Sequence, residues 1–178
     1  MSNITRRTLI KRLGASASVS SLSWPVLAAE RAPRDLSFFH LHTGESLSLT
    51  YHDGYQYVPG ALSEVNLFLS DFRTQESHRI DPELLDILHD LQTCLNCQNK
   101  FEVISGYRSP ATNEQLRQTS GGVAKKSLHM QGRAIDVRLS DVDSDRLRQA
   151  AISLGRGGVG YYPASNFVHL DTGRFRYW

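Results

Sequence analysis

The chain has few of the residues that cross-link a protein covalently or hold it in a membrane. It contains two cysteines in 178 residues and no apolar run of the length that an ordinary transmembrane helix needs. A disulfide-rich secreted scaffold is therefore excluded. Internal repeats are also absent, so the length and the 40% hydrophobic content predict one domain with its own core.

The two cysteines form the pattern Cys94-Leu95-Asn96-Cys97. Such a pair can be a redox couple, half of a zinc site or a local disulfide. No second pair exists to complete a four-cysteine zinc site, and the pair lies late in a predicted helix, where an intact turn is poor disulfide geometry. We favour an incidental or structural pair over a redox centre.

Positive charge is concentrated at the N-terminus. The formal net charge is +2, but residues 1–28 hold four basic residues and no acidic one. The remaining chain has 16 basic against 18 acidic residues, a net charge of −2. No clustered basic face is expected, and nucleic acid is not a predicted partner.

The N-terminal segment has the order of features found in export signals. Residues 5–11, Thr-Arg-Arg-Thr-Leu-Ile-Lys, are similar to the twin-arginine motif, and a weakly apolar Ser/Ala-rich stretch follows over residues 13–29. We predict a twin-arginine signal over residues 1–28, with the export machinery as a partner. Cleavage near Ala28 and retention as an anchor both stay open, and a disordered basic tail is the alternative.

Residues 29–178 alternate between short strands and amphipathic helices. This pattern predicts an α+β fold with a small, mainly antiparallel sheet and flanking helices. The expected strands are residues 36–41, 46–51, 101–105, 134–137, 159–161 and 167–170, and the expected helices are residues 62–72, 112–118, 143–154 and a helix that begins at Asp81-Pro82.

Two histidines and one aspartate form a candidate metal site. His129 and Asp136 are seven residues apart with Gly132 between them, so a tight turn can bring His129 beside the strand that carries Asp136. His169 lies in a second short apolar strand. Two imidazoles and one carboxylate suit zinc, which in peptidases commonly has three protein ligands and one open position.

The same residues carry a family resemblance. Ser127, His129, Gly132, Ala134 and Asp136 reproduce the Ser-x-His-x-x-Gly-x-Ala-x-Asp signature and resemble the LAS zinc peptidases of the lysostaphin, D-Ala-D-Ala and hedgehog type. Ile-Ser-Gly-Tyr-Arg-Ser (104–109), Gly-Val-Ala-Lys-Lys-Ser (122–127), Val-Gly-Tyr-Tyr-Pro (159–163) and Asn-Phe-Val-His-Leu-Asp-Thr-Gly (166–173) are similar to the murein endopeptidase K branch.

The resemblance implies a hedgehog/D-Ala-D-Ala peptidase-like fold with zinc on His129, Asp136 and His169. It further implies a periplasmic endopeptidase that cleaves the stem-peptide cross-links of peptidoglycan, including bridges between two diaminopimelate residues. A D,D- or L,D-carboxypeptidase and a non-catalytic peptidoglycan-binding module are the alternatives. No stable protein partner is predicted.

The resemblance leaves the general base unassigned. D-Ala-D-Ala peptidases have a Glu three residues before the second zinc histidine, where this chain has Asn166, and Phe167 replaces the second His of other relatives. Asp171 is our candidate, because it shares a strand face with His169. A hydrogen bond that orients a ligand is its equally weighted alternative role. His42 is a weaker candidate.

Two further residues are assigned to the substrate by the same resemblance. Arg108 follows a strand end, and its guanidinium could bind a carboxylate or a developing oxyanion. A surface salt bridge is the alternative role. Ser127 is expected to hydrogen-bond the substrate or the adjacent loop, and residues 119–127, which contain Lys125 and Lys126, are expected near the substrate.

Overall fold

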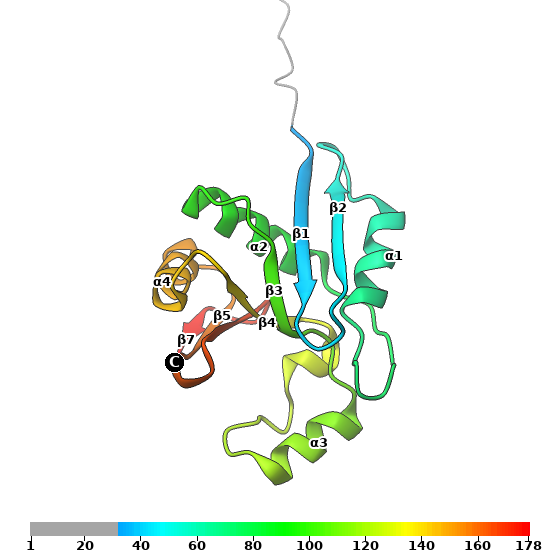
Figure 1. Cartoon of the computed structure of the whole chain (residues 1–178), viewed down its shortest axis with the longest axis vertical. Coiled ribbons are helices and arrows are strands. Elements are labelled where there is room, and N and C mark those ends of the chain that lie inside the picture. Colours follow the sequence, from blue (N-terminus) through cyan, green and yellow to red (C-terminus); the bar gives the residue numbers. More distant parts are fainter. Residues whose placement is uncertain (1–31) are drawn as a thin grey trace, which may run out of the picture. The chain divides into compact units, whose positions relative to one another are not determined.

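Residues 32–178 are the part of the chain that this computed structural model describes, and they contain a seven-stranded sheet (Figure 1). The predicted export signal lies outside the described residues. The strands are β1 (Arg34–His40), β2 (Ser46–His52), β3 (Phe101–Ser105), β4 (Ala134–Leu139), β5 (Gly158–Tyr162), β6 (Phe167–Asp171) and β7 (Arg176–Tyr177). Their order in the sheet is β2-β1-β3-β4-β6-β5-β7. Only β1 with β3 and β5 with β7 pair in parallel, which confirms the mainly antiparallel α+β class.

The helices follow the capping signals of the sequence. They are α1 (Pro59–Phe68), α2 (Pro82–Leu95), α3 (Pro110–Thr119) and α4 (Ser144–Leu154), with 3-10 turns η1 (Leu128–Gln131) and η2 (Pro163–Ser165). Asp81 caps α2 as predicted, because its carboxylate accepts the Glu83 N–H at 3.2 Å. α2 ends at Asn96 in the left-handed conformation, so Cys97 lies beyond the helix; both cysteines are free thiols.

The first helix differs from its prediction. The apolar spacing of residues 62–72 predicts a helix there, but α1 begins earlier, at Pro59, and ends at Phe68. Proline suits the first helical turn, which explains the early start. At the other end the buried Asp71 carboxylate accepts the Arg73 N–H at 3.0 Å and the Ser109 N–H at 2.8 Å, so the chain turns instead of continuing as a helix.

The core lies between the sheet and the helices α2 and α4, which also pack against each other. Six leucines and isoleucines of α2 are buried: Leu84, Leu85, Ile87, Leu88, Leu91 and Leu95. From the sheet, Ile135 and Val137 of β4 and Val168 and Leu170 of β6 join them. Within the described residues, no helix has the length and apolarity to cross a membrane.

Candidate metal centre

The centre is built on the sheet face that points away from this core. In β4 and β6 alternate side chains enter the core, so the residues between them point to the other face. Asp136 of β4 and His169 of β6 are direct cross-strand partners in the antiparallel register. Their placement as neighbours therefore follows from strand pairing alone, as in the predicted arrangement.

The 3-10 turn η1 brings His129 to the same place. Ser127 caps this turn by accepting the His129 N–H at 3.3 Å. Gly132 ends it with φ +64°, where a Cβ would collide with the Arg79 carbonyl, so this position requires glycine. The turn between His129 and Asp136 that the sequence predicts is thus confirmed.

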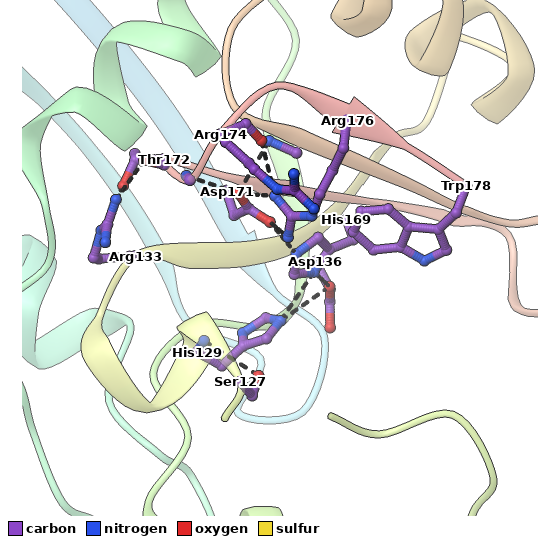
Figure 2. Close-up of polar contacts among 12 residues, drawn as sticks. Ser127, His129, Arg133, Asp136, His169, Asp171, Thr172, Arg174, Arg176 and Trp178 are labelled. Atoms are coloured by element: carbon purple, nitrogen blue, oxygen red, sulfur yellow. Dashed lines mark hydrogen bonds and ion pairs between the residues drawn. The ribbon is translucent and has the colours of Figure 1, made fainter. Parts of the chain in front are cut away.

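Three ligand atoms converge at this point (Figure 2). His129 Nε2 lies 3.1 Å from His169 Nδ1 and 3.2 Å from Asp136 Oδ1, and His169 Nδ1 lies 2.8 Å from Asp136 Oδ1. Ligands about 2.1 Å from a tetrahedral metal ion lie about 3.4 Å apart, slightly more than these spacings. Within the described residues, this is the only group of three or more His, Cys, Asp or Glu side chains whose ligand atoms lie close enough together to hold a metal ion.

The positions of the protons explain why this group requires a cation. His129 Nδ1 lies 2.7 Å from the Gly106 carbonyl, which can only accept, so this nitrogen carries the proton. His169 Nε2 likewise faces the Asp171 carboxylate at 3.1 Å. The neutral imidazoles therefore present lone pairs at His129 Nε2 and His169 Nδ1, beside the charged Asp136. Three lone pairs at 2.8 to 3.2 Å repel one another unless a positive ion lies between them.

The pKa values reflect the same arrangement. Burial lowers the pKa of His129, which keeps this imidazole neutral and able to bind a metal. Burial also disfavours charge on His169, but hydrogen bonds to Asp136 and Asp171 outweigh it and raise the pKa of His169 to about 9. For Asp136, the burial effect is outweighed by the two histidines, which hold its pKa well below the usual range. In the metal-free centre a proton on His169 thus supplies the cation.

Asp171 lies behind His169, on the side of the imidazole away from the three ligand atoms. It is fully buried and accepts the backbone N–H groups of Gly158 and Gly173 at 3.0 and 2.8 Å. Arg176 adds two more hydrogen bonds at 3.0 and 2.7 Å. Despite burial, the hydrogen bonds from His169 and Arg176 hold the pKa of Asp171 well below its usual range. The acceptor positions of Asp171 are therefore occupied, which favours its predicted role as an orienting partner over its predicted role as general base.

An open cleft of about 640 Å³ gives access to the centre. The loop after α3 lines it from Ser120 to Ala124, together with Lys126 and Ser127, so the predicted loop does lie at the site. Ser127 itself is buried and serves to cap η1.

Arg108 also lines the cleft, although its guanidinium is held by the centre. Arg108 Nη2 lies 3.4 Å from Asp136 Oδ2, the carboxylate oxygen that does not face the histidines. Burial lowers the pKa of Arg108, whose side chain is 11% exposed. The residue therefore supports a ligand as well as facing the cleft, a role that the sequence did not reveal.

His42 does not belong to the centre. Its ring stacks on Phe72 at a centroid distance of 4.1 Å, beside the turn between β1 and β2, and it does not line the cleft. The geometry of the site therefore gives no support to His42 as the base. Within the described residues, Asp136 and Asp171 are the carboxylates that line this cleft.

Sequence reasoning missed the short strand β7 and two of the residues it brings to the site. Arg176 binds Asp171, and the Trp178 ring lies beside His169 at a centroid distance of 5.5 Å (Figure 2). A strand of two residues is too short for a periodic signal. The carbonyl of Gly106 was also missed, since no side chain marks its contact with His129.

A His–Asp–His centre at the base of an open cleft has the ligand set of catalytic metal sites such as those of metal-dependent peptidases. One family model, described as peptidoglycan L,D-endopeptidase MepK, matches residues 28–178. The chain belongs to this family.

Two relatives are similar to the chain over nearly its full length. The chain is 43% identical over 175 residues to the peptidoglycan L,D-endopeptidase MepK of Escherichia coli (strain K12), covering 97% of this chain and 96% of the relative. The MepK of Shigella flexneri gives the same values. Among solved structures, the Serratia marcescens L-Ala D-Glu endopeptidase ChiX is 20% identical to the chain, with a TM-score of 0.36. The matched region covers 53% of this chain and 68% of the ChiX chain.

Proposed function

We propose that this protein is a zinc-dependent peptidoglycan endopeptidase that hydrolyses L,D peptide bonds in the cross-links between stem peptides. The observation that carries the proposal is the convergence of three lone pairs, from His129, Asp136 and His169, at the base of the cleft. The family of the chain and the names of its relatives supply the substrate class.

Zinc is the metal that this donor set favours. Two imidazole nitrogens and one carboxylate oxygen are typical catalytic zinc ligands, and the cleft leaves room for a fourth, exchangeable one. When bound, zinc supplies a water of near-neutral pKa and polarises the carbonyl of the peptide bond. The three ligand atoms lie within 2.8 to 3.2 Å of one another.

The surrounding residues fix the orientation of each ligand. The Gly106 carbonyl holds the His129 ring, Asp171 holds His169, and Arg108 holds Asp136. Partners of this kind fix the tautomer and position of a ligand, and their loss typically weakens metal binding by about 10- to 100-fold. We therefore assign Asp171 and Arg108 as positioning residues of the centre.

The charge of the cleft suits an anionic peptide. Arg108 and Lys126 both line it, and stem peptides carry free carboxylates beside the cross-link. The fully charged Arg108 can contact such a carboxylate or the developing oxyanion while it retains its contact with Asp136. Location follows from the substrate, and we propose export to the periplasm by the twin-arginine signal of residues 1–28.

The test uses two defined muropeptide dimers, one joined by an L,D bond between diaminopimelate residues and one by a D,D bond. Zinc-loaded protein is expected to convert the L,D dimer to monomers, and a chelator is expected to abolish this conversion. His169→Ala should lose activity and zinc, whereas His42→Ala, which changes a histidine outside the cleft, should retain both.

Three other results would contradict the proposal. Release of single amino acids without opening of dimers would indicate a carboxypeptidase. Binding to peptidoglycan with no product, at full zinc occupancy, would indicate a binding module. Cleavage of the D,D dimer alone would exclude the L,D specificity.

A further inference from the structure

Side chains from β7 and from the residue after it reach the metal centre across β5, which has glycine at the two positions that they cross. β5 lies between β6 and β7, and on the face of the centre it carries Gly158 and Gly160. These glycines pair with Asp171 and His169 of β6. Neither has a positive φ, so the backbone itself does not require glycine there. What the two positions provide is space.

Two side chains of the C-terminal segment occupy that space. The Arg176 guanidinium crosses Gly158 to reach Asp171, and a Cβ on Gly158 would collide with both groups. The Trp178 indole crosses Gly160, where a Cβ would lie 2.7 Å from the indole ring and 3.1 Å from the His169 Cβ. Gly158 thus leaves space for Arg176 beside Asp171. Gly160 leaves space for Trp178 beside His169.

Hydrogen bonds and a cation–π contact hold Trp178 in place, although the residue is half exposed. Its backbone N–H donates to the Val159 carbonyl at 3.1 Å, and its carbonyl accepts the Tyr161 N–H at 3.0 Å. The Arg176 guanidinium lies 5.0 Å from the indole centroid, and the indole N–H donates to the Tyr162 hydroxyl at 3.3 Å. The side chain is nevertheless 50% exposed and lines the cleft.

Aromatic neighbours extend this surface along the cleft. Tyr162 stacks on Phe167 at a centroid distance of 4.6 Å, and both line the same cleft as Trp178. The site therefore offers two kinds of contact, cationic from Arg108 and Lys126 and aromatic from Trp178, Tyr162 and Phe167. An exposed, immobilised indole beside a metal ligand loses little entropy when a ligand packs on it.

We propose that Trp178, admitted by Gly160, is a substrate-binding residue that packs on the aliphatic part of the stem-peptide residue next to the scissile bond. The proposal rests on the proposed endopeptidase function. It assigns carboxylate recognition to the cationic residues and alignment of the apolar part of the substrate to the indole.

Kinetics of the zinc-loaded full chain on the L,D dimer test this role. Trp178→Ala should raise KM roughly tenfold with kcat changed by less than about twofold, because the contact serves ground state and transition state alike. Trp178→Phe should recover part of the loss. Tyr177→Ala is the matched control: this side chain is 60% exposed on the adjacent position of β7, does not line the cleft, and should leave KM unchanged.

Gly160→Ala provides the sharper test, because it displaces the indole without removing it. The single variant should match Trp178→Ala in KM, at unchanged zinc content. The double variant Gly160→Ala/Trp178→Ala should be no worse than Trp178→Ala alone, since the added methyl then meets no indole. Additive losses, or lost zinc in Gly160→Ala, would mean that Gly160 acts through His169 and would overturn the proposal.

Tryptophan fluorescence gives a readout that does not depend on turnover. The chain has two tryptophans, so Trp24→Phe leaves Trp178 as the sole one. Titration of this metal-free variant with the L,D dimer should change the emission of Trp178. No emission change at saturating dimer, or an unchanged KM in Trp178→Ala, overturns the role of Trp178. An inactive zinc-loaded wild type overturns the proposed function itself.

Discussion

Two acid clusters, one half-buried around Asp86 and one buried around Asp136, differ in how hydrogen-bond donors balance acceptors. In the first, Asp86 of α2 accepts hydrogen bonds from Arg34 Nη1 at 2.8 Å, from the Tyr51 hydroxyl at 3.0 Å and from the Tyr57 hydroxyl at 2.7 Å. Burial raises the pKa of Tyr57 to about 12, so its hydroxyl remains a donor. Every acceptor at this cluster faces a hydrogen.

The second cluster, around Asp136, is the opposite case. In their neutral forms, His129 and His169 each donate their one ring proton away from the cluster, to Gly106 and to Asp171. Three acceptor atoms are left facing one another at 2.8 to 3.2 Å. A buried cluster with matched donors and acceptors is complete as a structural element, whereas one with surplus acceptors requires a cation. The comparison separates a structural acid from a metal ligand without reference to any relative.

The same substitution in both clusters gives the largest expected contrast. Asp136→Asn removes the charge that binds the metal, so zinc content and activity should fall together, with activity reduced at least about a thousandfold. Asp86→Asn should keep zinc and activity but lower the free energy of unfolding by about 1 to 3 kcal/mol, because buried donors lose part of their acceptor. Metal analysis, dimer cleavage and urea unfolding measure the two variants. Zinc retained in Asp136→Asn would break the comparison.

Asp171 shares features of both clusters, since it is saturated with donors yet contacts a metal ligand. Asp171→Asn should weaken zinc binding by about 10- to 100-fold, because His169 loses the acceptor that orients it. Excess zinc should then restore most of kcat. If the variant stays inactive at full zinc occupancy, Asp171 accepts a proton in the reaction after all.

The pH dependence of zinc affinity tests the proton that replaces the metal. Because the pKa of His169 is raised to about 9, this imidazole is protonated in the metal-free protein at neutral pH, and zinc must displace that proton. Apparent zinc affinity should fall about tenfold for each pH unit below 9. Calorimetry at pH 7.5 in buffers of different ionisation enthalpy should show release of about one proton per zinc. No released proton would contradict the assignment.

The raised pKa of His169 also predicts how the thermal stability of the metal-free protein depends on pH. The folded pKa of His169 lies above its ordinary value of 6.5, so its contribution to stability is complete below pH 6.5 and is lost as the pH rises through 9. The melting temperature of the metal-free protein should therefore fall across this window. The zinc-loaded protein should show a smaller fall, because metal replaces the proton. Equal slopes for the two forms would count against this origin.

The smallest expected effect comes from the structural cluster. Tyr51→Phe removes one of three hydrogen bonds to Asp86 and should cost about 1 kcal/mol of unfolding free energy. Zinc affinity and KM should not change, because the cleft residues do not include Tyr51. A change in either value would show that the two clusters are coupled.

The sequence predicted what local spacing determines. Gly132 between His129 and Asp136 indicated the turn, and the strand predicted over residues 134–137 contains Asp136. The cap at Asp81 located α2. By contrast, the end of α1 depends on Asp71 binding the backbone of Ser109, 38 residues away, which apolar spacing does not reveal.

The role of Asp171 could not be decided for the same reason. Its position two residues after His169 is compatible with a base and with an orienting partner. What separates these roles is the donor set from Gly158, Gly173 and Arg176, two of which come from other elements of the fold. Arg108 is similar, since its contact with Asp136 spans 28 residues. Contacts that form only in the folded chain, rather than residue types, indicate both roles.

The proton shared between His169 and Asp136 also bears on the order of events in the cell. With that proton in place, His169 and Asp136 form an ion pair in the absence of metal, so metal loading is predicted to exchange one cation for another. If the protein is exported folded by the twin-arginine route, as we propose, this exchange can take place after export, in the compartment that contains the substrate.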